Sequence, residues 1–174
     1  ESKLKSGTTF TLKLKKHTPP SWFTSEILIP DNSDIVVVDD DAPIHRVWKQ
    51  ALASNLLAAK GTRLLHIYGP VEFNTFMNNR DLERNLVVLL DHNFLGSETL
   101  GVELIENFKL QDNAYLVTSN ADDSKLQKRC EENQIKLIPK KLSQQVSIKS
   151  EVLIPQYDAV YIDDEQAMFS DGEQ

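Results

Sequence analysis

The chain has 174 residues, of which 40% are hydrophobic and 26% charged, the balance of a globular protein with enough apolar sequence for one domain. Its formal net charge of -7 argues against a general binder of nucleic acids or anionic membranes, because phosphate-rich partners need a basic face. The single cysteine, Cys130, excludes an internal disulfide and a cysteine-based zinc site. No apolar run approaches the roughly 20 residues of a membrane span, so a cytoplasmic location without direct membrane contact is expected.

Residues 8–16, TTFTLKLKK, alternate apolar and polar side chains and are predicted to form a strand with one buried face. The segment that follows contains two adjacent prolines, which cannot continue a strand ladder. Residues 19–31 are therefore expected to form an extended linker that separates residues 1–18 from a domain that begins at residue 32.

From residue 34 onward, short apolar segments alternate with segments of helical periodicity. The predicted strands are residues 34–38, 63–69, 85–91, 113–119 and 135–140. The predicted helices are residues 42–61, 71–79, 99–110 and 124–133. Strands that are apolar throughout and separated by helices indicate a parallel sheet covered on both faces. The sequence thus predicts an α/β fold with a doubly wound, five-stranded parallel sheet.

Polar side chains follow these strands at their carboxyl ends, where open α/β sheets bind ligands. They are Asp39, Asp40, Asp41, Asp91, Thr118, Ser119 and Lys140. Carboxylates of this kind suit Mg²⁺, and a cation would offset the repulsion among three consecutive aspartates. An isolated run of three aspartates is usually a solvated turn, so the expectation depends on the whole set.

Four motifs mark the strand ends of this region, namely VVVDDDAPIHRVW, LLDHN, YLVTSN and LIPKK. In their order and spacing they resemble the receiver domain of two-component response regulators. The resemblance covers residues 32–148 and implies the flavodoxin-like fold. It also implies transfer of a phosphoryl group from a phosphohistidine, on a histidine kinase core or a phosphotransfer domain, followed by slow self-dephosphorylation.

The resemblance implies a role for each matching residue. The catalytic residues would be Asp91 as phosphoacceptor, Thr118 as the hydroxyl that bonds the phosphoryl oxygen, and Lys140 as its ammonium partner. The Mg²⁺ ligands would be Asp39, Asp40, Asp91 and the backbone carbonyl of Asn93. The third acid, Asp41, has no ligand role in the family.

The flanks extend this interpretation. SKLKSGTTFTLKL resembles the last glycine box and final strand of a histidine-kinase ATP-binding domain, with Lys5 in place of the first glycine. Too little of that domain is present to enclose ATP, so residues 1–18 are interpreted as its remnant in a hybrid histidine kinase. Residues 149–174 are interpreted as a linker and acidic tail. Within them, DAVYIDDE repeats the form of DIVVVDDD, and residues 155–174 could instead begin a second receiver-like domain.

Several positions depart from the family pattern. Lys141 stands where receivers usually have proline, and Leu137 replaces an aromatic residue that rotates in the switch. The last helix of the fold has no clear periodicity in the sequence, and the spacing from Asp91 to Gly101 is long. His45 is expected to be an exposed helix residue, and Trp22 a packing residue.

Two other functions remain open. The chain could be a degenerate receiver that acts as a non-enzymatic interaction module, as the altered switch positions would allow. It could also be a Mg²⁺-dependent aspartyl phosphohydrolase with Asp39 as nucleophile, although Ala42 and Pro43 fit the turn of such enzymes poorly.

Overall fold

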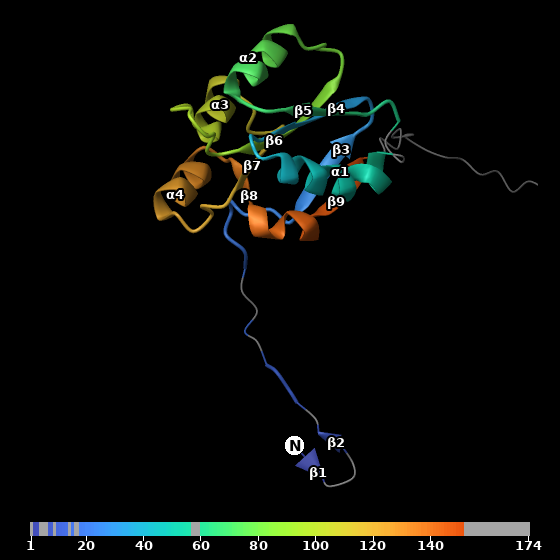
Figure 1. Ribbon diagram of the computed structural model, residues 1–174. Helices are drawn as coiled ribbons and strands as arrows, with labels where there is room; N and C mark the ends of the chain where they lie inside the picture. The colour runs from blue at the N-terminus through green and yellow to red at the C-terminus, as the bar shows by residue number, and fades with distance from the viewer. Residues whose placement is uncertain are drawn as a thin grey trace, which may run out of the picture.

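The computed structural model describes residues 2–3, 7–8, 10–13, 15, 18–56 and 60–151 (Figure 1). Its centre is a parallel sheet of five strands in the order β5-β4-β6-β7-β8. These strands are β4 (Ser33–Val38), β5 (Arg63–Ile67), β6 (Asn85–Asp91), β7 (Ala114–Thr118) and β8 (Lys136–Pro139). The predicted doubly wound α/β fold is confirmed, with the first strand between the second and the third.

Helices connect the strands and leave the sheet covered on both faces. They are α1 (Ala42–Leu56), α2 (Pro70–Asn79), α3 (Gly101–Asn107) and α4 (Ser124–Glu132). Each lies within the segment predicted to be helical, apart from the single residue Pro70 at the start of α2. Pro70 suits that position, because a proline in the first helical turn removes an N–H that would have no partner in the helix.

The two faces of the sheet carry two separate hydrophobic clusters. Val36 and Val38 of β4 point into the cluster formed with α2, α3 and α4, whereas Ile35 and Val37 point into the cluster formed with α1. This division follows from the alternation of side chains along a strand. It explains why every residue of β4 is apolar or paired, since neither face meets solvent.

A second, two-stranded parallel sheet completes the α1 side. β3 (Glu26–Pro30) pairs with β9 (Ser147–Glu151), two segments far apart in the sequence (Figure 1). Ile27 and Ile29 of β3 are fully buried in the α1 cluster. The interpretation of residues 19–31 as an extended linker is therefore wrong for β3, because two buried isoleucines make this segment part of the core.

The segment just before β3 lies along the free edge of β8. The Leu137 N–H donates to the Trp22 carbonyl at 2.7 Å, and the Thr24 N–H donates to the Leu137 carbonyl at 3.2 Å. Trp22 is partly buried against the cluster on the α2–α4 side, as expected of a packing residue. These bonds pair the exposed edge of the sheet, which otherwise would offer unpaired backbone groups.

The chain after β8 has no α-helix within the described residues. A 3₁₀ helix, η1 (Lys140–Gln145), leads directly to β9. The β3–β9 pair, rather than a helix, thus packs beside α1 on this face of the sheet.

The predicted strand over residues 8–16 is wrong for the part that the structure describes. Only β1 (Ser2–Lys3) and β2 (Gly7–Thr8) pair in this region, and residues 10–13 are not in a strand. Phe10 and Leu12 are 91% and 81% exposed, because an alternating segment forms a strand only where a sheet buries its apolar side.

Residues 149–151 of the expected linker and acidic tail belong to β9. The rest of that segment, with the possible second domain over residues 155–174, lies outside the described residues. The division of the rest of the chain into a kinase remnant, receiver and tail stays a prediction. Within the described part of the chain, no helix has the length and apolar character needed to cross a membrane.

Candidate functional site

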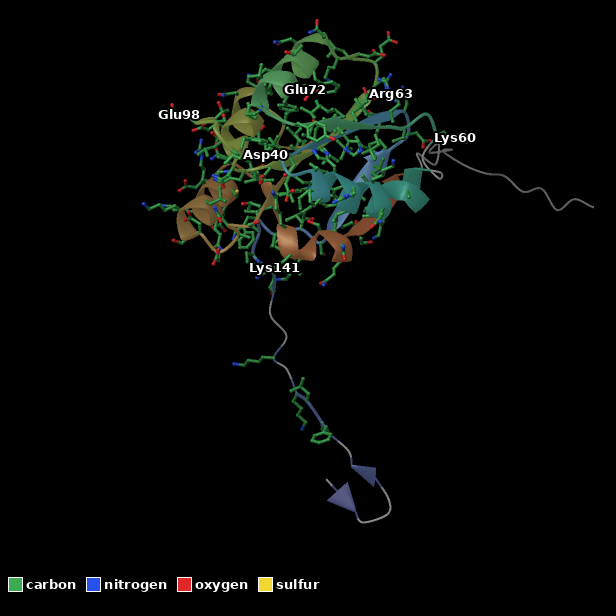
Figure 2. The ribbon with its side chains drawn as sticks, viewed as in Figure 1. Asp40, Lys60, Arg63, Glu72, Glu98 and Lys141 are labelled. Atoms are coloured by element: carbon green, nitrogen blue, oxygen red, sulfur yellow. The ribbon has the colours of Figure 1, made fainter. Side chains whose placement is uncertain are left out.

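The carboxyl ends of β4 and β6 bring an acidic cluster together. Val38 of β4 is opposite Leu90 of β6, so Asp39, which follows β4, lies beside Asp91, which ends β6. Carboxylate oxygens of Asp39, Asp40 and Asp91 all lie within 4.8 Å of one another. Figure 2 places Asp40 at this end of the sheet and Arg63, the first residue of β5, at the other end. The expectation that these acids converge is confirmed.

Lys140 joins the cluster from the end of β8. Its Nζ atom lies 2.8 Å from Oδ2 of Asp39 and 2.8 Å from Oδ2 of Asp91. The lysine side chain is only 16% exposed, and both carboxylates are less exposed still. One ammonium therefore bridges the two buried acids, and hydrogen bonds to charged groups of this kind are strong.

A backbone N–H also donates to one oxygen of each of the three carboxylates. Oδ1 of Asp39 accepts from the Asp41 N–H at 2.9 Å, and Oδ1 of Asp91 accepts from the His92 N–H at 2.7 Å. Oδ2 of the exposed Asp40 accepts from the Leu95 N–H at 2.7 Å. The last contact joins the turn after β4 to the loop after β6. These backbone hydrogen bonds thus orient all three carboxylates.

Gly101 shapes the loop after Asp91. Its N–H donates to the His92 carbonyl at 2.9 Å, and Asn93 forms an isolated antiparallel bridge with Leu100. A Cβ atom at Gly101 would stand 1.8 Å from the Asp91 carbonyl oxygen. The long spacing between these residues is accommodated by a loop that folds back onto Asp91, and only glycine allows the close approach.

Burial and charge set the protonation of the site. Burial raises the pKa of Asp91 above its usual value, and the neighbouring Asp39 adds to this, while the hydrogen bond from Lys140 works against it. Burial alone would lower the pKa of Lys140, but its bonds to Asp39 and Asp91 outweigh that effect and raise it. Lys140 therefore stays charged at neutral pH.

The donor set fits a hard divalent cation. Three carboxylates face a single ammonium, which leaves two formal negative charges uncompensated at one point. Each carboxylate oxygen has a second lone pair beyond the one used for the hydrogen bonds above. Oxygen ligands and two excess charges match Mg²⁺, which keeps several waters and takes few protein ligands.

The remaining predicted residues lie around this cluster. Thr118 is buried at the end of β7, and its Oγ1 accepts from the Asn120 N–H at 3.0 Å. Asn93 is exposed, and its side-chain oxygen accepts from Asn120 Nδ2 at 3.3 Å. The roles assigned to Thr118 and Asn93 stay predictions.

A pocket of about 370 Å³ opens beside Lys140. Its walls come from the ends of β7 and β8, from α4 and from the segment along the edge of β8. Trp22, Thr118 and Lys141 are among the lining residues. The pocket thus connects the polar end of β7 with an aromatic side chain from outside the sheet, which sequence patterns did not place near the site.

His45 is the clearest difference from the sequence-based expectation. It is only 4% exposed, and its Nε2 lies 2.7 Å from the Asp39 carbonyl oxygen. Its position in α1, four residues after Asp41, puts it on the side of the helix that faces the end of β4. Helical spacing alone does not reveal this contact, because it depends on how α1 packs on the sheet.

No family model matches the sequence, and no curated protein matches it. Among solved structures, the RcsB response regulator of Salmonella typhimurium is similar, with a TM-score of 0.51 and 12% identity over 66% of this chain and 55% of that chain. The signal receiver domain of an HD domain-containing protein from Pseudomonas fluorescens Pf-5 gives a TM-score of 0.49 and 16% identity, over 63% of this chain and 83% of that chain. The bacteriophytochrome response regulator AtBRR gives 0.47 and 19%, over 64% of this chain and 84% of that chain.

The likeness to RcsB shows the fold of this chain, which spans about half the length of that protein. The chain has the flavodoxin-like fold of receiver domains, with the strand order in which the first strand lies between the second and the third. An acidic pocket with a lysine lies at the carboxyl end of its sheet.

Proposed function

We propose that this chain is a phosphoacceptor receiver domain that takes a phosphoryl group from a phosphohistidine onto Asp91. The contact that carries the proposal is the Lys140 ammonium, 2.8 Å from both Asp39 and Asp91 and beside the carboxylate of Asp40. A nucleophilic carboxylate, a fixed cation and a divalent metal site at one point are the parts that phosphoryl transfer needs.

In the proposed reaction, the P–N bond of the phosphohistidine breaks as a P–O bond to Asp91 forms. The departing nitrogen keeps the electron pair of the broken bond, and its ring binds one proton from solvent. The product is an acyl phosphate on Asp91 and a neutral histidine on the donor.

The residues of the pocket act mainly by position and charge. Asp91 is buried and held by the His92 N–H, so little reorientation precedes attack. Lys140 would pair with an oxygen of the bound phosphoryl group, and the Thr118 hydroxyl would donate to another. Asp39 and Asp40 would hold Mg²⁺, which when bound neutralises charge on the phosphoryl oxygens.

The wider context is also part of the proposal. The resemblance of residues 1–18 to the end of a kinase ATP-binding domain supports a hybrid histidine kinase as the parent protein. The partner would then be the phosphohistidine of a kinase core or of a phosphotransfer domain. A cytoplasmic location for this segment stays a prediction.

A non-enzymatic interaction module is the second candidate, and one observation favours it. η1 and β9 follow β8 in the chain, where the family has its last helix, and β9 pairs with β3. Leu137 is fully buried in β8, in place of the rotating aromatic residue of the family. An altered output surface would allow signalling by docking without phosphorylation.

Intact-mass analysis after incubation with Mg²⁺ and acetyl phosphate tests the proposal. An adduct of one phosphoryl group on the parent chain and none on Asp91→Asn would support it. The opposite result, in which Asp91→Asn keeps the adduct and Asp39→Asn loses it, would point to the phosphohydrolase alternative. The absence of any adduct, when a control receiver is labelled in the same buffer, would favour the interaction module.

A further inference from the structure

The imidazole of His45 is buried between α1 and the end of β5. Its Nε2 atom lies 2.7 Å from the Asp39 carbonyl oxygen, and its Nδ1 atom lies 2.8 Å from Nδ1 of His66. The ring also packs on Tyr68, with 4.3 Å between the ring centroids. Contacts with three different residues thus define the orientation of this side chain.

The contact with Asp39 determines which ring nitrogen of His45 acts as a donor. A backbone carbonyl oxygen only accepts hydrogen bonds, so Nε2 of His45 must carry a proton and donate it. This holds if His45 is neutral and accepts a hydrogen bond from His66, and equally if His45 is charged and donates to His66. The bond to Asp39 therefore does not depend on the protonation state of the pair.

The bond fixes one particular peptide of the site. The Asp39 N–H donates to the Ile67 carbonyl at 3.1 Å, which continues the pairing of β4 with β5. The Asp39 carbonyl belongs to the next peptide, which joins Asp39 to Asp40. Rotation of that peptide would move the Asp40 carboxylate relative to those of Asp39 and Asp91, and the His45 bond opposes this rotation.

We propose that His45 is a positioning residue of the acidic cluster, which holds the peptide between Asp39 and Asp40 through its Nε2 donor. His66 in turn holds the imidazole in the orientation that this bond requires. The inference rests on the proposed function, because it assumes that the carboxylates of Asp39, Asp40 and Asp91 bind Mg²⁺.

Loss of the donor leaves a buried carbonyl without a partner, and the peptide gains freedom to turn toward another donor. Hydrogen-bond partners of metal ligands typically change metal affinity by 10- to 100-fold when they are removed. Because His45 holds the backbone of Asp39 and not a ligand atom, we expect the lower value, a rise of about 10-fold in the Kd for Mg²⁺.

The test compares three substitutions of His45 by calorimetric titration with Mg²⁺ on the full chain. The amide nitrogen of glutamine lies as many bonds from Cα as Nε2 of histidine, whereas that of asparagine corresponds to Nδ1. His45→Gln therefore keeps a donor for Asp39, and His45→Asn and His45→Ala do not. Ala51→Gly is the matched control, because it weakens the same helix away from the cluster.

The expected result is a Kd about 10-fold higher in His45→Ala and His45→Asn, near the parent value in His45→Gln, and unchanged in Ala51→Gly. Equal affinity in all His45 variants would overturn the inference. An equal loss in Ala51→Gly would do the same, since general weakening of α1 would then be the cause. A loss in His45→Gln as large as in His45→Ala would overturn the assignment of the donor atom.

The two proposals fail in different ways. A parent chain that binds Mg²⁺ but gains no phosphoryl group would contradict the phosphoacceptor function, and the affinities of the His45 variants would still decide the inference. A parent chain that binds no Mg²⁺ would overturn the inference directly. If the parent chain is phosphorylated and the His45 variants bind Mg²⁺ as tightly as the parent, only the inference about His45 is overturned.

Discussion

The carbonyl oxygen of Asp91 lies so close to Gly101 that a Cβ atom there would approach it to 1.8 Å. The contact joins the proposed phosphoacceptor to the first residue of α3. The loop between them therefore has its conformation determined at both ends, and the orientation of Asp91 depends on the start of this helix.

Gly101→Ala is expected to lower the free energy of unfolding by about 1–3 kcal/mol, because the backbone must shift to admit the methyl group. The same shift would displace Asp91, so phosphoryl incorporation should fall even where the protein stays folded. Urea unfolding and intact-mass analysis measure the two effects. Gly96→Ala is the control in the same loop. Its φ of +73° adds backbone strain, but a Cβ there meets no atom within 4 Å. Full labelling of Gly101→Ala would contradict the prediction.

Lys140→Met should raise the pKa of Asp91 further, because the ammonium opposes the effects of burial and of Asp39. A carboxyl whose pKa is raised in the folded state contributes stability that is present below its unfolded pKa and lost as the pH rises through its folded pKa. The variant should therefore lose more stability at pH 7 than at pH 4. Carboxyl NMR titration and urea unfolding at both pH values measure these changes in metal-free buffer.

Lys141→Met is the matched control for that experiment, since Lys141 is exposed and makes no ion pair with the described acids of the cluster. It should leave the titration of Asp91 where it is in the parent chain. A lower pKa for Asp91 in Lys140→Met would contradict the arrangement of charges described above.

Mg²⁺ should stabilise the folded chain. At about 100 times its Kd, a ligand that binds only the folded state adds ~2.7 kcal/mol to the free energy of unfolding. Asp40→Asn should reduce this gain, because Asp40 contributes one of the three clustered carboxylates. Asp41→Asn, on the neighbouring exposed residue, should keep it. Thermal unfolding with Mg²⁺ and with chelator at equal ionic strength gives the comparison, and a gain that is equal in both variants would argue against metal binding at this cluster.

Arg84→Met should destabilise the opposite end of the sheet without affecting phosphorylation. Arg84 and Arg63 pair with the buried Asp34 at 2.6 and 2.8 Å, and the hydrogen bond from Arg63, with that from Arg84, lowers the pKa of Asp34 against the effect of burial. We expect a loss of about 2–3 kcal/mol at neutral pH. A lowered folded pKa means that the contribution of Asp34 is present above its unfolded pKa and lost as the pH falls through the folded one, so the effect of the variant should shrink in acid. Denaturant unfolding from pH 7 down to pH 3 follows this, and a parallel loss of labelling would mean that the two ends are coupled.

Ile27→Ala should cost about 2–4 kcal/mol, because the side chain is fully buried on β3. Leu28→Ala, on the next residue, should cost far less, since Leu28 is 42% exposed. Equilibrium unfolding of the two variants tests whether β3 belongs to the folded domain. Similar small losses in both variants would contradict the place of β3 in the hydrophobic core.

The helices and the five central strands could be predicted because each has a local pattern. The apolar residues of β4 and β6 occupy both faces of a strand. Asp123 precedes α4 and caps it, because its side chain accepts from the Lys125 N–H at 2.8 Å. Such patterns need only the neighbouring residues. The convergence of Asp39, Asp91 and Lys140 followed from the same patterns, because the carboxyl ends of parallel strands meet at one edge of a sheet.

β3, β9 and the contacts of His45 could not be predicted in this way. β3 is short and lies next to a proline-rich segment, and its partner comes from the far end of the domain. The burial of His45 depends on the packing of α1 against the strand that carries His66.

The sequence by itself determined the parallel sheet, its helices and the set of charged side chains at its carboxyl edge. The reason is that the spacing of apolar residues, and the alternation of strands with helices, can be recognised along the chain. Only the tertiary structure decided that β3 and β9 pair, that Trp22 reaches the pocket beside Lys140, and that His45 donates to Asp39. These contacts join segments that are distant along the chain, and their formation depends on the packing of whole elements rather than on the residues next to them.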